Sequence, residues 1–153
     1  MTRFFLDTVF LQALNNPNDP HHADASEVNR KLRSSGQFRS DRDLFLSDLV
    51  FREVTEGLLD DCGYRTAMTV RRSLRANYSI LRTREDDLAN AFDGICSRFH
   101  SGAGSGVGLV DAVSVLLMQR NRIGLIVSTD SSFDLVPTIR RIWLHNVDEI
   151  RTL

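Results

Sequence analysis

The chain has 153 residues, of which 42% are hydrophobic and 25% are charged, and its formal net charge is −1. This length suits one domain with a single core and is too short for two. No apolar run approaches the ~18 residues that a transmembrane helix needs, and Asp7 interrupts the first apolar run too early for a secretory signal. We therefore expect a cytoplasmic protein that does not enter a membrane.

The basic residues are almost all of one kind, since Lys31 is the single exception to arginine among the 19. Guanidinium groups suit phosphate, but a GC-rich genome also favours arginine codons, so this bias leaves the partner open. Cys62 and Cys96 have neither CxxC spacing nor paired histidines nearby. This argues against a zinc site or a disulfide framework and predicts two ordinary buried or half-buried thiols.

The first third of the chain predicts one strand and two helices. Residues 3–6 form a short apolar run, typical of a buried strand, which ends at Asp7. A short helix is expected over residues 9–14, before a dense cluster of turn residues at positions 15–20. Residues 21–32 have the apolar spacing of an amphipathic helix, which Ser34, Ser35 and Gly36 end.

The middle third predicts two more strands and three helices. Residues 43–47 are expected to form a strand, and Ser47 or Asp48 to cap a helix that passes through Glu53 to about residue 60. A further helix over residues 64–76 and a strand over 78–81 follow. The segment from Thr83 to Asp86 resembles a capping box or first turn, and predicts a helix to about residue 99.

The last third begins with a glycine-rich stretch, residues 101–108, which we interpret as a mobile connector. An apolar helix over residues 109–119 and a buried strand over 123–128 follow, and Asp130 comes directly after that strand. A short helical turn over 133–139 and a strand over 141–144 complete the pattern. Strands alternating with helices predict a single α/β domain, residues 1–153, with a parallel sheet of about five strands covered on both faces.

Carboxylates mark one edge of this predicted sheet. Ligands bind beyond the carboxyl ends of parallel strands, and both Asp7 and Asp130 directly follow a strand. Glu53, about a turn and a half into the helix after the second strand, can lean back over the first. Asp111 lies in the first turn of the helix that leads into strand 123–128. We expect that turn at the opposite edge, so simple topology does not bring Asp111 to the other acids.

The surroundings of these acids favour a metal site. Asp7 and Asp111 have apolar neighbours on both sides, and acidic residues are rarely buried unless they are paired or bind metal. Two carboxylates about 4 Å apart repel by roughly 4 kcal/mol at an effective dielectric near 20. A cation or protonation must offset this cost, and oxygen ligands favour Mg²⁺ or Mn²⁺ over zinc. Taken singly, each acid could instead cap a turn or interact with a helix dipole.

Four segments of the sequence resemble the motifs of the PIN-domain family in their order and spacing. They are the residues 5–8 (Phe-Leu-Asp-Thr), 46–54, 109–112 (Leu-Val-Asp-Ala) and 127–133. The turn at residues 16–22 also resembles the loop that often follows the first motif. The resemblance covers essentially the whole chain, and it implies a PIN-like three-layer sandwich in which helices flank a central parallel sheet of five strands.

The resemblance also implies an activity, that of a ribonuclease dependent on Mg²⁺ or Mn²⁺ whose acidic cluster is Asp7, Glu53, Asp111 and Asp130. Many compact members of the family are VapC-type toxins, which act as homodimers and are inhibited by a small antitoxin. The alternatives are a PIN ribonuclease without an antitoxin, serving RNA processing, and a catalytically silent PIN fold used for binding. Val9 stands where the family usually has Asn or Ser, which predicts weaker metal affinity.

Other candidates surround this cluster. Thr8 and Thr129 are expected at the mouth of the site, where their hydroxyls could bind the acids or a phosphate, and Asp134 is a possible fifth acid or a solvated turn residue. RNA also needs cationic contacts outside the metal site. The candidates are Arg30, Lys31, Arg33, Arg71, Arg72 and Arg75, with Arg39 and Arg42 near the first three. Both groups could instead be solvated helix faces, and the second could meet an antitoxin or a second copy of the chain.

Overall fold

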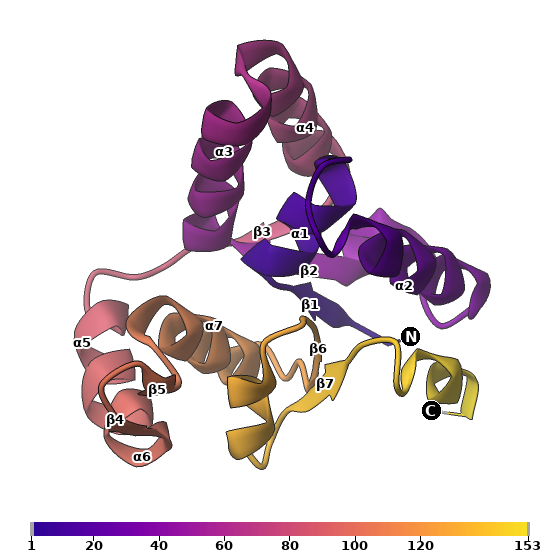
Figure 1. Ribbon diagram of the computed structural model, residues 1–153. Coiled ribbons are helices and arrows are strands. Elements are labelled where there is room, and N and C mark those ends of the chain that lie inside the picture. Colours follow the sequence, from indigo (N-terminus) through magenta and orange to yellow (C-terminus); the bar gives the residue numbers. More distant parts are fainter. Residues whose placement is uncertain (1, 153) are drawn as a thin grey trace.

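Five parallel strands form the central sheet of the computed structural model, which describes residues 2–152. Their order across the sheet is β3-β2-β1-β6-β7 (Figure 1), so the buried strand β1 lies in the middle. The strands are β1 (Phe4–Leu6), β2 (Leu44–Ser47), β3 (Ser79–Leu81), β6 (Leu125–Val127) and β7 (Arg140–Ile142). The parallel five-stranded sheet predicted from the sequence is confirmed.

Helices connect these strands. The longer ones are α1 (Thr8–Asn15), α2 (His22–Ser34), α3 (Asp48–Cys62), α4 (Tyr64–Asn77) and α7 (Leu109–Arg120). A shorter helical run comprises α5 (Asp87–Ala91), a π-helical turn (Phe92–Cys96) and α6 (Ser97–Phe99). The structure also has three 3-10 helices, η1 (Asp41–Asp43), η3 (Ser131–Leu135) and η4 (Val147–Thr152), within the described residues. Within residues 2–152, no helix combines the length and hydropathy needed to cross a bilayer.

The strand order decides which face each helix covers. The chain moves outward from β1 through β2 to β3, and then returns past β1 to β6 on the other side. Because parallel crossovers are right-handed, this reversal of direction puts α1 to α4 on one face and α5 to α7 on the other, as Figure 1 shows. The order reverses between β1 and β6, and at such a switch point an α/β sheet opens a crevice at its carboxyl edge.

The core fills both faces of the middle strands. Phe4, Phe5 and Leu6 on β1 are at most 1% exposed, as expected for a strand covered on both faces. On α7 the buried positions form an almost continuous run from Ala112 to Met118, because this helix packs against the sheet on one side and α5 on the other. This packing holds the start of α7 in a fixed position.

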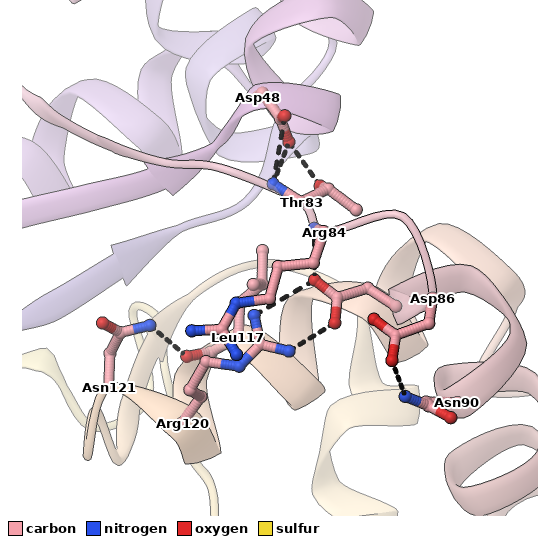
Figure 2. A network of polar contacts seen from close by, with 9 residues as sticks. Asp48, Thr83, Arg84, Asp86, Asn90, Leu117, Arg120 and Asn121 are labelled. Carbon is pink, nitrogen blue, oxygen red and sulfur yellow. Dashed lines mark hydrogen bonds and ion pairs between the residues drawn. The ribbon is translucent and has the colours of Figure 1, made fainter.

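The predicted helix over residues 83–99 begins later and is broken. Thr83 does not cap a helix, because its amide and its hydroxyl both donate to the Asp48 carboxylate at the start of α3 (Figure 2). The helix starts at Asp87 instead, whose side chain accepts from the Arg84 amide at 2.6 Å and pairs with Arg120 of α7. The tertiary contact with Asp48 therefore prevents Thr83 from capping a helix, although the local sequence resembles a cap.

The glycine-rich stretch, for which the sequence predicted a connector, contains a short two-stranded hairpin. His100–Gly102 forms β4 and Ser105–Gly106 forms β5, which pair in antiparallel fashion. Gly104 and Gly106 have φ angles of 71° and 97°, a region that favours glycine. A Cβ on Gly106 would lie 2.1 Å from the Phe99 carbonyl oxygen. The glycines thus permit a tight return of the chain, which the composition alone did not indicate.

Candidate functional site

Asp7 lies at the switch point, directly after β1, and is 4% exposed. Its backbone amide extends the sheet by donating to the Val127 carbonyl of β6 at 3.2 Å. Its side chain accepts a 2.6 Å hydrogen bond from the Ser128 hydroxyl, which lies at the end of that same neighbouring strand. Asp7 is therefore fixed by β6 at the carboxyl edge, where the sequence predicted it.

Asp130 follows β6 and is fixed by the turn that it begins. Its side chain caps η3 by accepting from the Ser132 amide at 2.9 Å and from the Ser132 hydroxyl at 2.7 Å. Its own amide donates to the Ser128 hydroxyl at 3.0 Å. Ser128 thus links Asp130 and Asp7, which places both strand-end acids at the same edge.

Glu53 approaches from α3, on the other side of β1. The Thr8 hydroxyl, in the first turn of α1, donates to the Glu53 carboxylate at 2.9 Å. The Gln12 side chain, one turn further along α1, donates to the Glu53 backbone carbonyl at 3.1 Å. The start of α1 therefore ties Glu53 to the residue next to Asp7.

Asp111 also lies at this edge, and the expectation that its helix begins at the opposite edge was wrong. A helix between two parallel strands runs antiparallel to both, so its first turn lies at the carboxyl edge and its last turn precedes the next strand. The Asp111 carboxyl is close enough to Asp130 to share a hydrogen bond, and the charges of Asp7 and Glu53 also act on it. Topology alone, correctly applied, predicts this position.

The electrostatics show how strongly these carboxylates interact. Burial, followed by repulsion from Asp7 and Asp130, raises the pKa of Asp111 from 3.8 to about 8. Burial also raises the pKa of Asp7 to about 6, although the hydrogen bond from Ser128 opposes this shift. The nearby Asp111 charge adds to the burial that raises the pKa of the Cys96 thiol. The site therefore favours anything that neutralises negative charge, either protons or a cation.

The charges of the four acids act on one another, but their side chains are not arranged as the complete ligand set of a metal ion. Within residues 2–152, no three His, Cys, Asp or Glu side chains are arranged so that they could already hold a metal ion. Asp7, Glu53 and Asp130 instead each accept a hydrogen bond from a neighbouring hydroxyl. Binding a cation would require side-chain rotations that bring carboxylate oxygens closer together.

Within residues 2–152, two of the three supporting candidates, Thr129 and Asp134, form no hydrogen bond with the four acids. Asp134 is 52% exposed in its side chain and pairs with Arg141 of β7 at 3.0 Å, so it holds η3 to the sheet. Thr129 is half-buried between Ser128 and Asp130. The residue that sequence reasoning missed is Ser128, and a buried hydroxyl at the last position of an apolar strand could have indicated its role.

The basic candidates on α2 already have intramolecular partners. Arg30 pairs with Glu27 at 2.6 Å and Lys31 with Asp148 at 2.7 Å. Arg33 pairs with Asp41 and also donates to the Tyr78 hydroxyl. Because Asp41 and Tyr78 precede β2 and β3, Arg33 lies at the amino edge of the sheet, opposite the acids. These positions do not favour α2 as the helix that binds RNA.

The basic candidates on α4 are placed differently. The guanidinium groups of Arg71 and Arg75 lie 5.6 and 5.4 Å from the centre of the Phe51 ring on α3. Arg72 lies between them on α4 and is exposed. Among residues 2–152, none of these arginines forms an ion pair with an acid. Their charges remain available to a ligand.

Comparison with solved structures shows which proteins share this fold. VapC20 of Mycobacterium tuberculosis, a toxin that cleaves the sarcin-ricin loop, superposes with a TM-score of 0.69 at 20% sequence identity, over 88% of this chain and 95% of that one. A toxin-antitoxin complex from Klebsiella pneumoniae gives a TM-score of 0.63 at 17% identity, over 91% of this chain and 96% of that one. No protein-family model and no curated protein matches the sequence.

These similarities establish the fold. The sheet of five parallel strands flanked by helices is the PIN-like α/β fold of the VapC-type toxins, as the sequence motifs implied. The coverage is nearly complete for both chains, so the likeness extends over the whole domain. A shared fold at such low identity does not specify the activity, which depends on the residues of the site itself.

Proposed function

We propose that this protein is a metal-dependent endoribonuclease, the toxin of a VapBC-type pair. The observation that carries the proposal is the convergence of Asp7, Glu53, Asp111 and Asp130, from four separate elements, at the switch point of a PIN-like sheet. A raised pKa in two carboxyls, one buried and one partly buried, is costly for the fold, and such groups cluster at functional sites. One structural neighbour, VapC20, cleaves the sarcin-ricin loop, which makes RNA the expected substrate of this chain.

The donor set suits Mg²⁺ or Mn²⁺. All four side chains offer carboxylate oxygens, and hard divalent cations prefer oxygen ligands. Asp7 and Asp111 would contribute most to cation affinity, because burial, and after it the neighbouring negative charges, disfavours their ionised forms. Val9, where the family usually has a polar residue, is 38% exposed beside Asp7 and offers no side-chain hydrogen bond, which is consistent with moderate affinity.

The reaction would be hydrolysis of a phosphodiester bond of RNA. A divalent cation held by the four acids would lower the pKa of a water molecule and stabilise the charge that develops on the phosphate. The hydroxyls of Thr8, Ser128 and Ser132 hold the carboxylates of Glu53, Asp7 and Asp130 in position. Glu53 or Asp111 would orient the attacking water, since both are only partly buried.

The partners follow from the same proposal. One structural neighbour is a toxin-antitoxin complex, which supports a small protein antitoxin as the inhibitor of this chain. A homodimer as the active form is part of the proposal and rests on the resemblance of the sequence to VapC-type toxins. The RNA substrate would be met in the cytoplasm. A short reading frame for a DNA-binding protein beside the gene would support the antitoxin, and its absence would favour a PIN ribonuclease of RNA processing.

Cleavage assays on varied RNAs with added Mg²⁺ or Mn²⁺ test the proposal. Wild type is expected to cleave, and Asp7→Asn to lose at least about 100-fold of the rate, since even changes around metal ligands cost 10- to 100-fold. Asp24→Asn is the matched control. It removes the same charge as Asp7→Asn, but from an exposed residue of α2 that lies away from the acid cluster. Equal cleavage by wild type and Asp7→Asn, or none by wild type, would refute the nuclease and favour a silent PIN fold.

A further inference from the structure

A hollow of about 640 Å³ lies beside the edge strand β3. We call it the β3 groove. It is lined by Arg42, Asp48, Phe51, Arg75, Tyr78, Ile80 and Arg82. These residues come from η1, α3, α4 and both ends of β3, so the groove follows the open edge of the sheet. Three of the seven lining residues are arginines, which gives the hollow a positive character.

The charges in the β3 groove are largely uncompensated. Within residues 2–152, Arg42, Arg75 and Arg82 form no ion pair, whereas Arg30, Lys31 and Arg33 of α2 are all paired with acids. The one acid in the groove, Asp48, already accepts hydrogen bonds from the Thr83 amide and hydroxyl and from the Leu49 amide (Figure 2). An anion would therefore meet three cations and one carboxylate whose oxygens are already engaged.

Two of the arginines are fixed in position before any ligand binds. The Arg42 guanidinium donates to the carbonyls of Tyr78 and Ala76 at 2.9 and 2.7 Å. Arg75 lies over the Phe51 ring. Fixed guanidinium groups lose little conformational entropy on binding and suit the geometry of phosphate oxygens. The groove is thus preorganised for phosphate.

One end of the groove lies at the same edge of the sheet as the acid cluster. Arg82 directly follows β3, whose last residue pairs with Ser47 at the end of β2. It therefore lies at the carboxyl edge, two strand spacings or about 10 Å from the end of β1 and Asp7. Arg42 precedes β2, so the groove runs from this edge towards the amino edge. A chain of phosphates could pass from the acids along the whole length of β3.

We propose that the β3 groove binds the phosphate backbone of a single RNA strand that extends from the cleavage site along β3. This inference rests on the proposed ribonuclease function and adds a second contact region to it. The groove would contribute to affinity and orientation, while the acids carry the chemistry. Phosphate contacts of this kind position a strand without reading its sequence.

The test compares two double variants with the same change in charge. Arg75→Gln/Arg82→Gln removes two charges from the groove, and Arg3→Gln/Arg140→Gln removes two at the amino edge, near the starts of β1 and β7. The probe is a fluorescein-labelled random-sequence RNA of about 12 nucleotides, a typical length for a single-strand site. Its Kd is measured by anisotropy in EDTA, which prevents metal-dependent cleavage, at several salt concentrations.

The groove variant is expected to raise the Kd roughly tenfold and to reduce the slope of log K against log salt by about 1.4, because each single-strand phosphate contact contributes about 0.7. The control variant should have the same Kd and the same salt slope as wild type. Arg82→Gln alone should give about half of the change in slope, and Arg82 forms no hydrogen bond or ion pair within residues 2–152 that its loss would remove. Thermal melting checks that each variant is folded. With metal present, the groove variant should raise KM and leave kcat unchanged.

Unchanged Kd and salt slope in the groove variant, or an equal loss in the control, would overturn the inference. A failure of the groove proposal can be distinguished from a failure of the ribonuclease proposal. If wild type cleaves RNA while the groove variant binds normally, only the groove is refuted. If wild type cleaves no RNA but the groove variant alone loses RNA binding in EDTA, the groove stands and the nuclease does not. An acidic protein segment as the occupant would leave RNA binding unchanged and so counts against the proposal.

Discussion

The Ser128 hydroxyl donates a 2.6 Å hydrogen bond to the Asp7 carboxylate across 121 positions of the chain. Both residues are almost fully buried, Ser128 at 0% and Asp7 at 4% exposure. The bond joins the ends of β1 and β6 at the switch point, and the same hydroxyl accepts from the Asp130 amide. Ser128 is therefore the residue through which the fold positions both strand-end acids.

Ser128→Ala is expected to destabilise the metal-free protein by about 1–3 kcal/mol, because it removes one hydrogen bond from the buried Asp7 carboxylate and takes away the acceptor of the Asp130 amide. Urea unfolding in EDTA measures this loss. Ser131→Ala is the matched control, since Ser131 is exposed and lies only three residues further along the chain. If both variants unfold at the same urea concentration, the Ser128 bond contributes nothing to stability.

The stability of the metal-free protein should fall as pH rises towards 8. The pKa values of Asp7 and Asp111 are about 6 and about 8 in the folded chain, against an ordinary value of 3.8. Between these limits the folded state holds more protons than the unfolded state, so raising the pH removes stability until both carboxyls have ionised. The window therefore runs from about pH 4 to about pH 8.

Thermal melting in EDTA between about pH 5.5 and 8.5 covers most of this window. Asp111→Asn should flatten the dependence, because it removes the carboxyl whose pKa is raised to about 8. Added Mg²⁺ or Mn²⁺ should raise the melting temperature most at the alkaline end, where the carboxylates are ionised. A wild-type melting temperature that rises with pH across this range would contradict the prediction.

The ion pair between Asp87 and Arg120 is expected to stabilise the fold. Figure 2 shows Arg120 of α7 beside Arg84, which lies in the segment just before α5. Asp87 is 0% exposed, and its hydrogen bond with Arg120 lowers the pKa of its carboxyl. Asp87→Asn should cost about 2–3 kcal/mol in urea unfolding. This is less than for a fully buried pair, because the Arg120 side chain is 26% exposed.

Asp86→Asn is the control for this ion pair. Asp86 is exposed, and the one hydrogen bond of its side chain within residues 2–152 is with Asn90, at 3.3 Å (Figure 2), so its loss should change the free energy of unfolding by less than about 0.5 kcal/mol. The contribution of Asp87 should also vanish at low pH, because a lowered pKa means that stability is lost as pH falls through it. Equal effects of the two substitutions would exclude a special role for the buried pair.

Gly106→Ala should disrupt the β4–β5 hairpin. The added Cβ would meet the Phe99 carbonyl oxygen at 2.1 Å, at a φ of 97° that side chains rarely adopt. Gly102→Ala has open space around the new Cβ and serves as the control. Limited proteolysis is expected to cut only the Gly106 variant within residues 100–106. Identical digestion patterns for the two variants would show that the hairpin does not need this close approach.

Sequence patterns determined much of this protein by themselves. The apolar runs that end at Asp7 and Asp130 specify two buried strands with acids at the carboxyl edge, because parallel strands share one edge for their ends. Helical spacing likewise predicted α4 and α7 to within about one residue at each end. These features depend on local periodicity and on chain direction, which a sequence records directly.

Tertiary structure alone decided the remaining features, and each one depends on a partner far away in the chain. Thr83 resembles a helix cap, but Asp48 takes its hydroxyl, and the glycine-rich stretch folds back because Gly106 fits against Phe99. The hydroxyl that orients Asp7 comes from the end of β6. No local pattern reports such contacts, because their energy depends on which segments the completed sheet brings together.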